Sequence, residues 1–556
     1  MVRIWHLGNS AGVRTVVCGL IVGLTALAPA WSAAPTRTKK RAEFTTGSSD
    51  VLISFIDQQV RQGWDDSELK PSPVAADAEW LRRVHLDIAG TIPPAAAIQK
   101  FLADKDKAKR SKVIEKLLDD EGYVRNWSTV WTNLLIGQQP QRRISRPGMQ
   151  KFLREAFGRN RPWDKVVYDL VTAEGHFEEN GAVNYMLASI PNNNDAGATA
   201  TARTTRLFMG VQVQCTQCHN HPFNDWQMDQ FWEFNSFFRQ MRRVDHRKYD
   251  EKTGRMVDDF SEVVFNDFSG PVYYEKRSGL MQVAYPKYFK EPIDPGDGIH
   301  RRQELGKMMI AGDKPYIAQA MVNRMWGHFF GYGFTKPVDD MGPHSPPTHP
   351  ELLDRLSVEF VKSGYDLKQL IRWICNSEAY NLTSVIGSKN SDDNPGAGES
   401  PMFTHLYIKH FTAEQLYNSL IVATSAHKSG RTNWDAAEKQ RQQWSGQFVT
   451  LFGTGDNDLI TNYNGSIPQA LVMMNGDLIK NATNGKAGSF LNAVVNSRDS
   501  DAEKVRQLYL ATLSRLPSRT ESGAATKMLK SYPDRGMAYQ DLFWALLNCN
   551  EFVMNH

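Results

Sequence analysis

Apolar side chains recur every three or four residues in one segment of this chain after another. Two clear examples are residues 51–60, with Val51, Leu52, Phe55, Ile56 and Val60, and residues 315–330, with Ile317, Met321, Met325, Trp326 and Phe329. This spacing matches the 3.6-residue period of an α-helix and places each set on one face. The chain is therefore predicted to be mainly α-helical, and its 556 residues exceed what a single compact core holds.

The character of the sequence changes between residues 246 and 300. Short runs of β-branched and aromatic residues alternate there with Gly, Pro and Asp, namely 263–265, 272–274 and 283–285. Such runs predict short strands. We therefore expect two helical domains, at 51–245 and 301–556, joined by an extended, strand-like connector at 246–300.

The first 32 residues have the layout of a secretory signal peptide. Arg3 and Arg14 precede the apolar run 16–27, and small residues follow it up to Ser32. The run is shorter than the roughly 20 apolar residues of a transmembrane helix, so an uncleaved membrane anchor is the less favoured alternative. We expect cleavage after Ser32, a flexible leader at 33–50, and export to the periplasm or the cell surface with no transmembrane span in the mature chain.

The net charge gives no indication of nucleic-acid binding. It is formally +4 for the whole chain and falls to +2 when the two arginines of the signal peptide are removed. A nearly neutral chain lacks the electrostatic attraction that binds a phosphate backbone. No Gly-rich phosphate loop, nucleophile elbow or HExxH helix occurs in the sequence either, so no common hydrolase class is favoured.

The most specific motif is Cys215-Thr216-Gln217-Cys218-His219. This C-x-x-C-H spacing is the attachment signature of c-type haem, in which two thiols bond to the haem and the histidine ligates the iron. Haem is attached to this motif outside the cytoplasm, where disulfides also persist, so the signal peptide and the motif support each other. Cys215, Cys218 and His219 are therefore the candidate haem-binding residues, with His219 on the iron.

Two other chemistries are open for the same motif. A zinc or copper ion could take Cys215 and Cys218 together with His221 or His219, although the usual second ligand pair a dozen or more residues later is absent from the sequence. Alternatively, the two cysteines form a structural or exchangeable disulfide. We rank the haem first, another metal second and the disulfide third.

A haem with two axial ligands needs a distal ligand from a remote part of the chain. His221 is tethered to the same face as His219 and is a poor candidate for that role. The remote candidates are His85, His328, His349 and Met281. His328 also lies beside Trp326 on a predicted helix, where a packed histidine is the favoured interpretation.

The proline-rich loop at 337–350 carries His344 and His349 together with Asp339 and Asp340. Carboxylates and imidazoles on one loop can bind a metal ion or a sugar. No ligand-spacing template fits them, so a loop held by aspartate caps is favoured.

Several blocks of the sequence resemble a known family. Those at 212–226 and 81–94 resemble the planctomycete cytochrome-like domain. Further blocks resemble the uncharacterised domain that usually follows it, at 322–331, 337–340, 346–353 and 511–517. The resemblance covers about residues 50–556 and implies an exported protein of two mainly helical domains, without implying a reaction. Family members often carry a further cysteine-containing stretch, but residues 454–467 contain no cysteine.

Together these features predict an exported c-type cytochrome-like protein that transfers electrons with a redox partner protein. The alternative is a zinc-binding or disulfide-stabilised surface protein without haem, linked to a cell-surface polysaccharide and its processing. One haem requires a domain of only about a hundred residues, so the large second domain indicates a role beyond electron shuttling.

Overall fold

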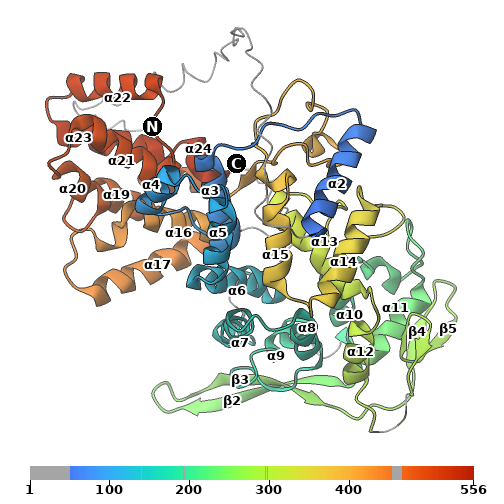
Figure 1. Ribbon diagram of the computed structural model, residues 1–556. Coiled ribbons are helices and arrows are strands. Elements are labelled where there is room, and N and C mark those ends of the chain that lie inside the picture. Colours follow the sequence, from blue (N-terminus) through green and yellow to red (C-terminus); the bar gives the residue numbers. More distant parts are fainter. Residues whose placement is uncertain (1–50, 140, 192–194, 295, 297, 454–465) are drawn as a thin grey trace, which may run out of the picture. The chain divides into compact units, whose positions relative to one another are not determined.

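The computed structural model describes residues 51–139, 141–191, 195–294, 296, 298–453 and 466–556. The predicted signal peptide and leader lie outside these residues. Helices dominate the described chain, and the strands form short antiparallel sheets (Figure 1). The predicted mainly helical fold class is therefore confirmed.

Helices make up most of the chain before the connector. They are α2 (Val51–Asp66), α3 (Asp77–Ala89), α4 (Ala95–Ala103), α5 (Lys109–Leu118), α6 (Glu121–Ile136), α7 (Arg146–Gly158), α8 (Trp163–Thr172), α9 (Val183–Ala188), α10 (Ala198–Thr204) and α11 (Met228–Asn235). Gly90 ends α3 with a left-handed φ of 70°, and a Cβ there would lie 2.3 Å from Oδ1 of Asn126 on α6. Only glycine combines that backbone angle with so close an approach.

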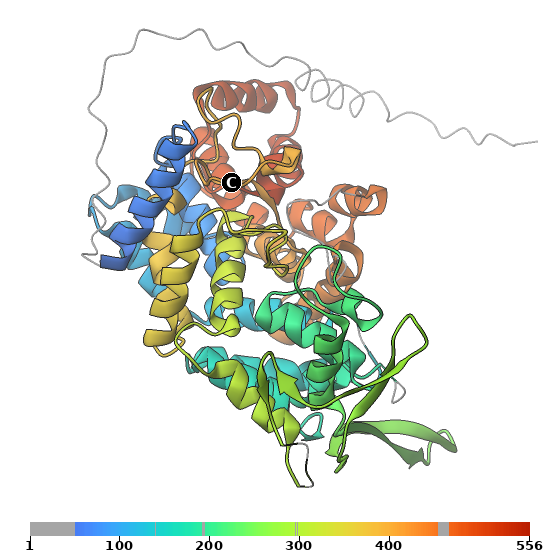
Figure 2. The same ribbon diagram turned by 90° about the vertical axis from the view of Figure 1, so that its right-hand side faces the viewer.

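Strands are concentrated in the predicted connector. β2 (Met241–Asp250) and β3 (Arg255–Phe265) form a long antiparallel hairpin, and β1 (Gly175–His176) pairs with the other edge of β3. Further two-stranded pairs are β4 (Val272–Glu275) with β5 (Met281–Ala284) and β6 (Lys287–Tyr288) with β7 (Glu291–Pro292). In both views the β2–β3 hairpin extends beyond the neighbouring helices (Figure 1, Figure 2).

The chain after the connector is again helical. Its helices are α12 (Arg301–Ile310), α13 (Tyr316–Phe330), α14 (Pro350–Lys362), α15 (Leu367–Asn376), α16 (Ala413–Thr424), α17 (Trp434–Phe452), α18 (Ile467–Asn475), α19 (Asp477–Thr483), α20 (Phe490–Val495), α21 (Asp501–Leu513), α22 (Arg519–Ser531), α23 (Arg535–Leu547) and α24 (Asn550–Val553). The short strands β8 (Lys409–His410) and β9 (Met554–Asn555) pair with each other. Thr412 and Gln415 form a capping box at the start of α16, which satisfies backbone donors that the helix leaves open.

Buried apolar side chains gather into two large clusters. The first runs from Leu52 to Tyr407 and also includes Leu510, and the second runs from Ala413 to Phe552. α3 contributes to both, because Trp80, Val84 and Ile88 belong to the first cluster while Leu86 belongs to the second. The apolar packing thus divides near residue 410, and α3 joins the two halves.

Charged residues of α3 are buried between these clusters. Oδ1 of Asp87 accepts hydrogen bonds from Nζ of Lys409 at 2.8 Å and from Nδ2 of Asn555 at 2.7 Å. Arg83 forms an ion pair with Glu79 at 2.9 Å. Because Lys409 lies on β8 and Asn555 on β9, Asp87 ties the C-terminal strand pair to α3.

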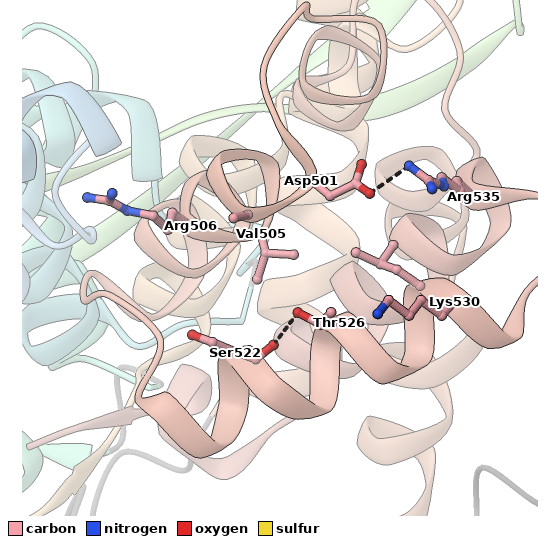
Figure 3. A pocket seen from close by; sticks show the side chains of 9 residues that line it. Asp501, Val505, Arg506, Ser522, Thr526, Lys530 and Arg535 are labelled. Atoms are coloured by element: carbon pink, nitrogen blue, oxygen red, sulfur yellow. Dashed lines mark hydrogen bonds and ion pairs between the residues drawn. The ribbon is translucent and has the colours of Figure 1, made fainter.

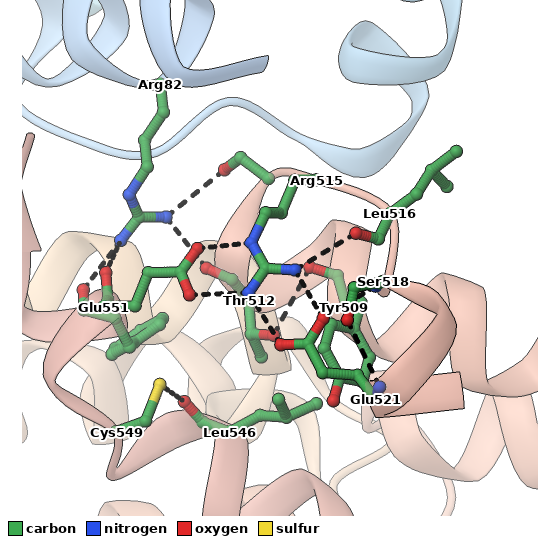
Figure 4. Close-up of polar contacts among 12 residues, drawn as sticks. Arg82, Tyr509, Thr512, Arg515, Leu516, Ser518, Glu521, Leu546, Cys549 and Glu551 are labelled. Atoms are coloured by element: carbon green, nitrogen blue, oxygen red, sulfur yellow. Dashed lines mark hydrogen bonds and ion pairs between the residues drawn. The ribbon is translucent and has the colours of Figure 1, made fainter. Parts of the chain in front are cut away.

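Arg82 points from α3 into the second cluster and is completely buried (Figure 4). Its guanidinium donates to the carbonyl oxygens of Thr512 at 2.8 Å and Phe552 at 2.7 Å, so backbone oxygens rather than a carboxylate bind it. Nearby, Arg515 bonds to Glu521 at 2.8 Å and to Glu551 at 2.6 Å. Carbonyls near helix ends lack partners within the helix, and Arg82 satisfies them here.

Candidate functional site

The cysteine motif follows a helix that ends in a tight turn. α10 passes into a π-helical turn at Thr205–Met209, and Gly210 then adopts a left-handed φ of 68°. A Cβ at Gly210 would lie 2.6 Å from Cε of Met341, so glycine also permits a close approach of the two segments. A small buried apolar cluster anchors the motif; it includes Val211 and Val213, which precede the motif, and Phe231, which follows it.

Cys215 and Cys218 lie at the two ends of a short turn. Residues Gln214–Gln217 form a 3₁₀ turn, and the N–H of Cys218 donates to the carbonyl of Cys215 at 3.3 Å. Both cysteines are free thiols; Cys218 is exposed and Cys215 is half-buried. Burial raises the pKa of the Cys215 thiol above its usual value, so this group is protonated at neutral pH. The pair thus presents two unpaired sulfur atoms at an accessible turn.

His219 has one ring nitrogen engaged. Its Nδ1 lies 2.7 Å from the carbonyl oxygen of Asn220. A carbonyl only accepts hydrogen bonds, so Nδ1 carries the proton and Nε2 carries the lone pair. A histidine in this state is ready to ligate a metal through Nε2.

His221 has the opposite arrangement. Its Nδ1 accepts hydrogen bonds from the N–H groups of Phe223 at 3.2 Å and Asn224 at 3.0 Å. Burial lowers the pKa of His221; Asp340 opposes this, and the neighbouring His344 and His219 lower the pKa further. The neutral ring therefore carries its proton on Nε2 and has no free lone pair for a metal.

The loop between α13 and α14 lies against the segment that leads into the motif. Asp340 accepts a hydrogen bond from the backbone N–H of Gln212 at 3.3 Å, and the N–H of Met341 donates to the carbonyl of Gly210 at 2.6 Å. Asp339 accepts from Nε of Arg206 at 2.8 Å and from the Gln212 side chain at 3.2 Å. These bonds tie the loop to residues before Cys215; they are not helix caps, and the N-cap residue of α14 is His349.

The same loop brings His344 beside the motif. Nε2 of His344 lies 3.0 Å from Oδ2 of Asp340, and the ring centroids of His344 and His221 are 5.7 Å apart. The sequence placed His344 in a loop with three other polar residues but gave no indication that this loop meets the cysteines. Only tertiary packing brings them together.

The other predicted ligands have different surroundings. His349 packs between Phe334 and Phe403 and is 5 % exposed. His328 bonds through Nε2 to the carbonyl of Asp87 at 3.0 Å and its ring lies 4.6 Å from that of Trp127, so it is a packed histidine as favoured from the sequence.

The last two ligands predicted from the sequence, His85 and Met281, lie in different surroundings, one half-buried and the other exposed. Burial lowers the pKa of His85, on α3, to about 4, which keeps this ring neutral. Met281 lies on β5 and is 55 % exposed. The remaining described cysteines, Cys375 and Cys549, are free thiols.

A bare metal ion needs several protein ligands at one point, and the described residues do not supply them. No group of three or more His, Cys, Asp or Glu side chains within the described ranges is arranged to hold a metal ion. Zinc sites use three or four such ligands. Cys215, Cys218 and His221 therefore do not form a preassembled zinc site in this arrangement.

A separate small cavity opens in the second cluster, between α21, α22 and α23 (Figure 3). Asp501 and Arg535 form an ion pair of 2.6 Å at its rim, and Lys530 and Arg506 also line it. The hydroxyl of Thr526 donates to the backbone carbonyl of Ser522 at 2.8 Å, as is common within a helix. The cavity contains no nucleophile–base pair among its lining residues.

No helix in the described part of the chain combines the length and the apolar character that a membrane span requires. The predicted signal peptide lies outside that part.

Two family models match the chain. Residues 55–243 match PSCyt2, a protein of unknown function (DUF1549), and residues 301–529 match PSD1, a protein of unknown function (DUF1553). These are the two domains that planctomycete cytochrome-like proteins carry. The cysteine motif lies in the first matched region, whereas Asp340 and His344 lie in the second. No curated protein and no solved structure matches the chain.

Proposed function

We propose that this chain, which carries the PSCyt2 and PSD1 domains, is an exported c-type haem protein that takes part in electron transfer. Cys215 and Cys218 hold the haem covalently, and His219 ligates its iron. The observation that carries the proposal is the hydrogen bond of His219. Its Nδ1 lies 2.7 Å from the Asn220 carbonyl, which leaves Nε2 as the ring nitrogen available to a metal, in the residue directly after the free thiol Cys218.

The residues present fit this group. Cys215 and Cys218 would hold the haem through thioether bonds, each formed when a thiol S–H adds across one vinyl group, with sulfur on one vinyl carbon and hydrogen on the other, so no oxidant would be needed. Both cysteines are free thiols, and Cys218 is exposed. Bound haem supplies a one-electron couple at iron, whose potential depends on the axial ligands and on burial.

Haem also accounts for the small number of ligands at the turn. The porphyrin provides four of the iron's ligands, so the protein needs to provide only one or two. A zinc ion would require three or four from the protein, which the described residues do not bring together. This difference favours haem over a bare ion.

The visible absorption spectrum tests the proposal. The full chain is expressed with c-type maturation machinery, reduced with dithionite and compared with a Cys215→Ala/Cys218→Ala variant. We expect the bands of a reduced c-type haem in the native protein and their loss in the variant. A folded, colourless native protein contradicts the haem, and metal analysis and thiol titration of that sample then distinguish a zinc protein from a disulfide protein.

A further inference from the structure

Three histidines lie at the cysteine turn, and they fall into two classes by their hydrogen bonds. In His219 and His344 one ring nitrogen faces a hydrogen-bond acceptor, the Asn220 carbonyl at 2.7 Å and the Asp340 carboxylate at 3.0 Å. In His221 a ring nitrogen instead accepts from two backbone N–H groups. Histidines that ligate metals usually donate their other ring N–H to a carboxylate or a carbonyl. His219 and His344 match that arrangement, and His221 does not.

The backbone turn that contains His344 leaves one ring nitrogen of this histidine, Nδ1, uncovered. The N–H of Ser345 donates to the carbonyl of Gly342 at 2.9 Å, which closes a tight turn with Pro343 and His344 at its corners. A Cβ at Gly342 would lie 3.0 Å from Cε1 and 3.1 Å from Nδ1 of His344. The absence of a side chain at Gly342 therefore keeps Nδ1 uncovered, and within the described residues this nitrogen takes part in no hydrogen bond.

The carboxylate that orients His344 also holds the segment that enters the motif. Oδ1 of Asp340 accepts from the N–H of Gln212, while Oδ2 faces Nε2 of His344. His344 is thus fixed relative to residues just before Cys215, although it belongs to the other matched region. The ring centroids of His221 and His344 are 5.7 Å apart, so the loop and the cysteine motif are neighbours at this point.

We propose that His344 would serve as the second histidine ligand of the haem iron, through Nδ1, with Asp340 as its orienting carboxylate. This inference rests on the proposed haem at Cys215, Cys218 and His219. The PSD1 region then completes a site that the PSCyt2 region begins. Two histidine ligands would leave no open position on the iron for an exogenous ligand, which suits electron transfer.

The spin state of the ferric protein tests this ligand independently of any activity. Electron paramagnetic resonance of the native protein, matured with haem, is expected to show a low-spin signal. In His344→Ala we expect loss of that signal and appearance of a high-spin signal, with low spin restored by added imidazole. His221→Ala is expected to keep the low-spin signal. Far-UV circular dichroism checks that each variant is folded.

A second variant leaves every ligand in place. Gly342→Ala adds a methyl group next to Nδ1 of His344, and we expect a mixture of low- and high-spin signals from it. Haem-loaded His344→Ala that stays low-spin overturns the inference and leaves the proposed function standing, as does a native protein that is already high-spin. A native protein without haem overturns both, and its lack of colour distinguishes that case. If His344→Ala fails to fold, an unchanged low-spin signal in Gly342→Ala overturns the inference.

Discussion

The backbone N–H of Gln212 donates to the carboxylate of Asp340 at 3.3 Å, across 128 residues of sequence. This bond joins the segment that enters the cysteine turn to the loop before α14. Asp339 adds bonds to Arg206 and to the Gln212 side chain. The cysteine turn is therefore supported by a loop from the second matched region, and a change in that loop is expected to alter the turn.

Asp339 is expected to stabilise this junction through its charge. It is 8 % exposed, and it forms ion pairs with Arg206 at 2.8 Å and Arg324 at 4.0 Å. Asp339→Asn removes the negative charge from beside the partly buried Arg324, and we expect a loss of about 2–4 kcal/mol in the free energy of unfolding. Urea denaturation followed by circular dichroism measures it. Asp354→Asn, at an exposed ion pair with Lys314, is the control and should leave the midpoint unchanged.

The effect of Asp339→Asn should depend on pH. Burial alone raises the pKa of Asp339, but Arg324 and Arg206 outweigh it and hold the pKa below its usual 3.8. A lowered pKa in the folded state contributes stability above the unfolded-state value, and this contribution is lost as the pH falls through the folded-state value. The stability difference between native protein and variant should therefore shrink below about pH 3.8. A difference that stays constant down to pH 3 contradicts the assignment.

Lys409 is expected to be among the most sensitive positions outside the site. Its ammonium group pairs with Asp87, and the two side chains are 7 % and 2 % exposed. Lys409→Met leaves the Asp87 carboxylate buried without a counter-charge, and we expect a loss of about 3–5 kcal/mol in urea denaturation. Lys112→Met removes an exposed lysine paired with Asp106 and serves as the control. Equal denaturation midpoints for the two variants would show that the buried pair is not important for stability.

Asp57 should make stability fall with rising pH. Burial raises its pKa from 3.8 to about 6, and it accepts a hydrogen bond from the N–H of Glu378 at 2.6 Å. Because the folded state favours the protonated form, the stability that this group contributes is lost as the pH rises from about 3.8 to about 6. Asp57→Asn keeps an oxygen acceptor and carries no charge, so its denaturation midpoint should exceed that of the native protein above pH 6 and approach it near pH 4. A constant offset across this range contradicts the prediction.

Gly210 should tolerate no side chain. Its φ of 68° costs other residues about 1–3 kcal/mol, and a Cβ would also contact Met341. Gly210→Ala is therefore expected to lower the thermal midpoint and the yield of haem-loaded protein. Gly446→Ala is the matched control, because Gly446 lies within α17 with nothing within 4 Å of a Cβ, and alanine there favours the helix. Equal midpoints for the two variants would contradict the assigned backbone strain.

Much of the helical framework follows from local sequence signals. α14 and α21 begin where the sequence signals a helix start, because Pro350 suits a first helical position and Ser500 caps α21. α17 is harder to predict from the sequence, since only its second half carries an apolar stripe, with Trp444, Phe448 and Phe452 buried. Its polar first half gives no periodic signal.

The sequence alone identifies only part of the candidate site. The spacing of Cys215, Cys218 and His219 identifies the motif without any structure. The distal ligands chosen from the sequence were chosen for their residue type, and His328 and His349 prove to be packed against aromatic rings. His344 meets the motif only because the Asp339–Asp340 bonds fold its loop back onto Gln212, which is a tertiary contact without a local sequence signal.

A covalent haem on Cys215 and Cys218 adds to the mass of the intact denatured protein, so mass spectrometry shows whether it is there. The protein is made with c-type maturation machinery next to an authentic c-type cytochrome as a positive control. We expect the mass of the mature polypeptide plus one haem for the native chain, and of the polypeptide alone for Cys215→Ala/Cys218→Ala. A native chain with the mass of the polypeptide alone, in cells that mature the control cytochrome, would rule out the covalent haem.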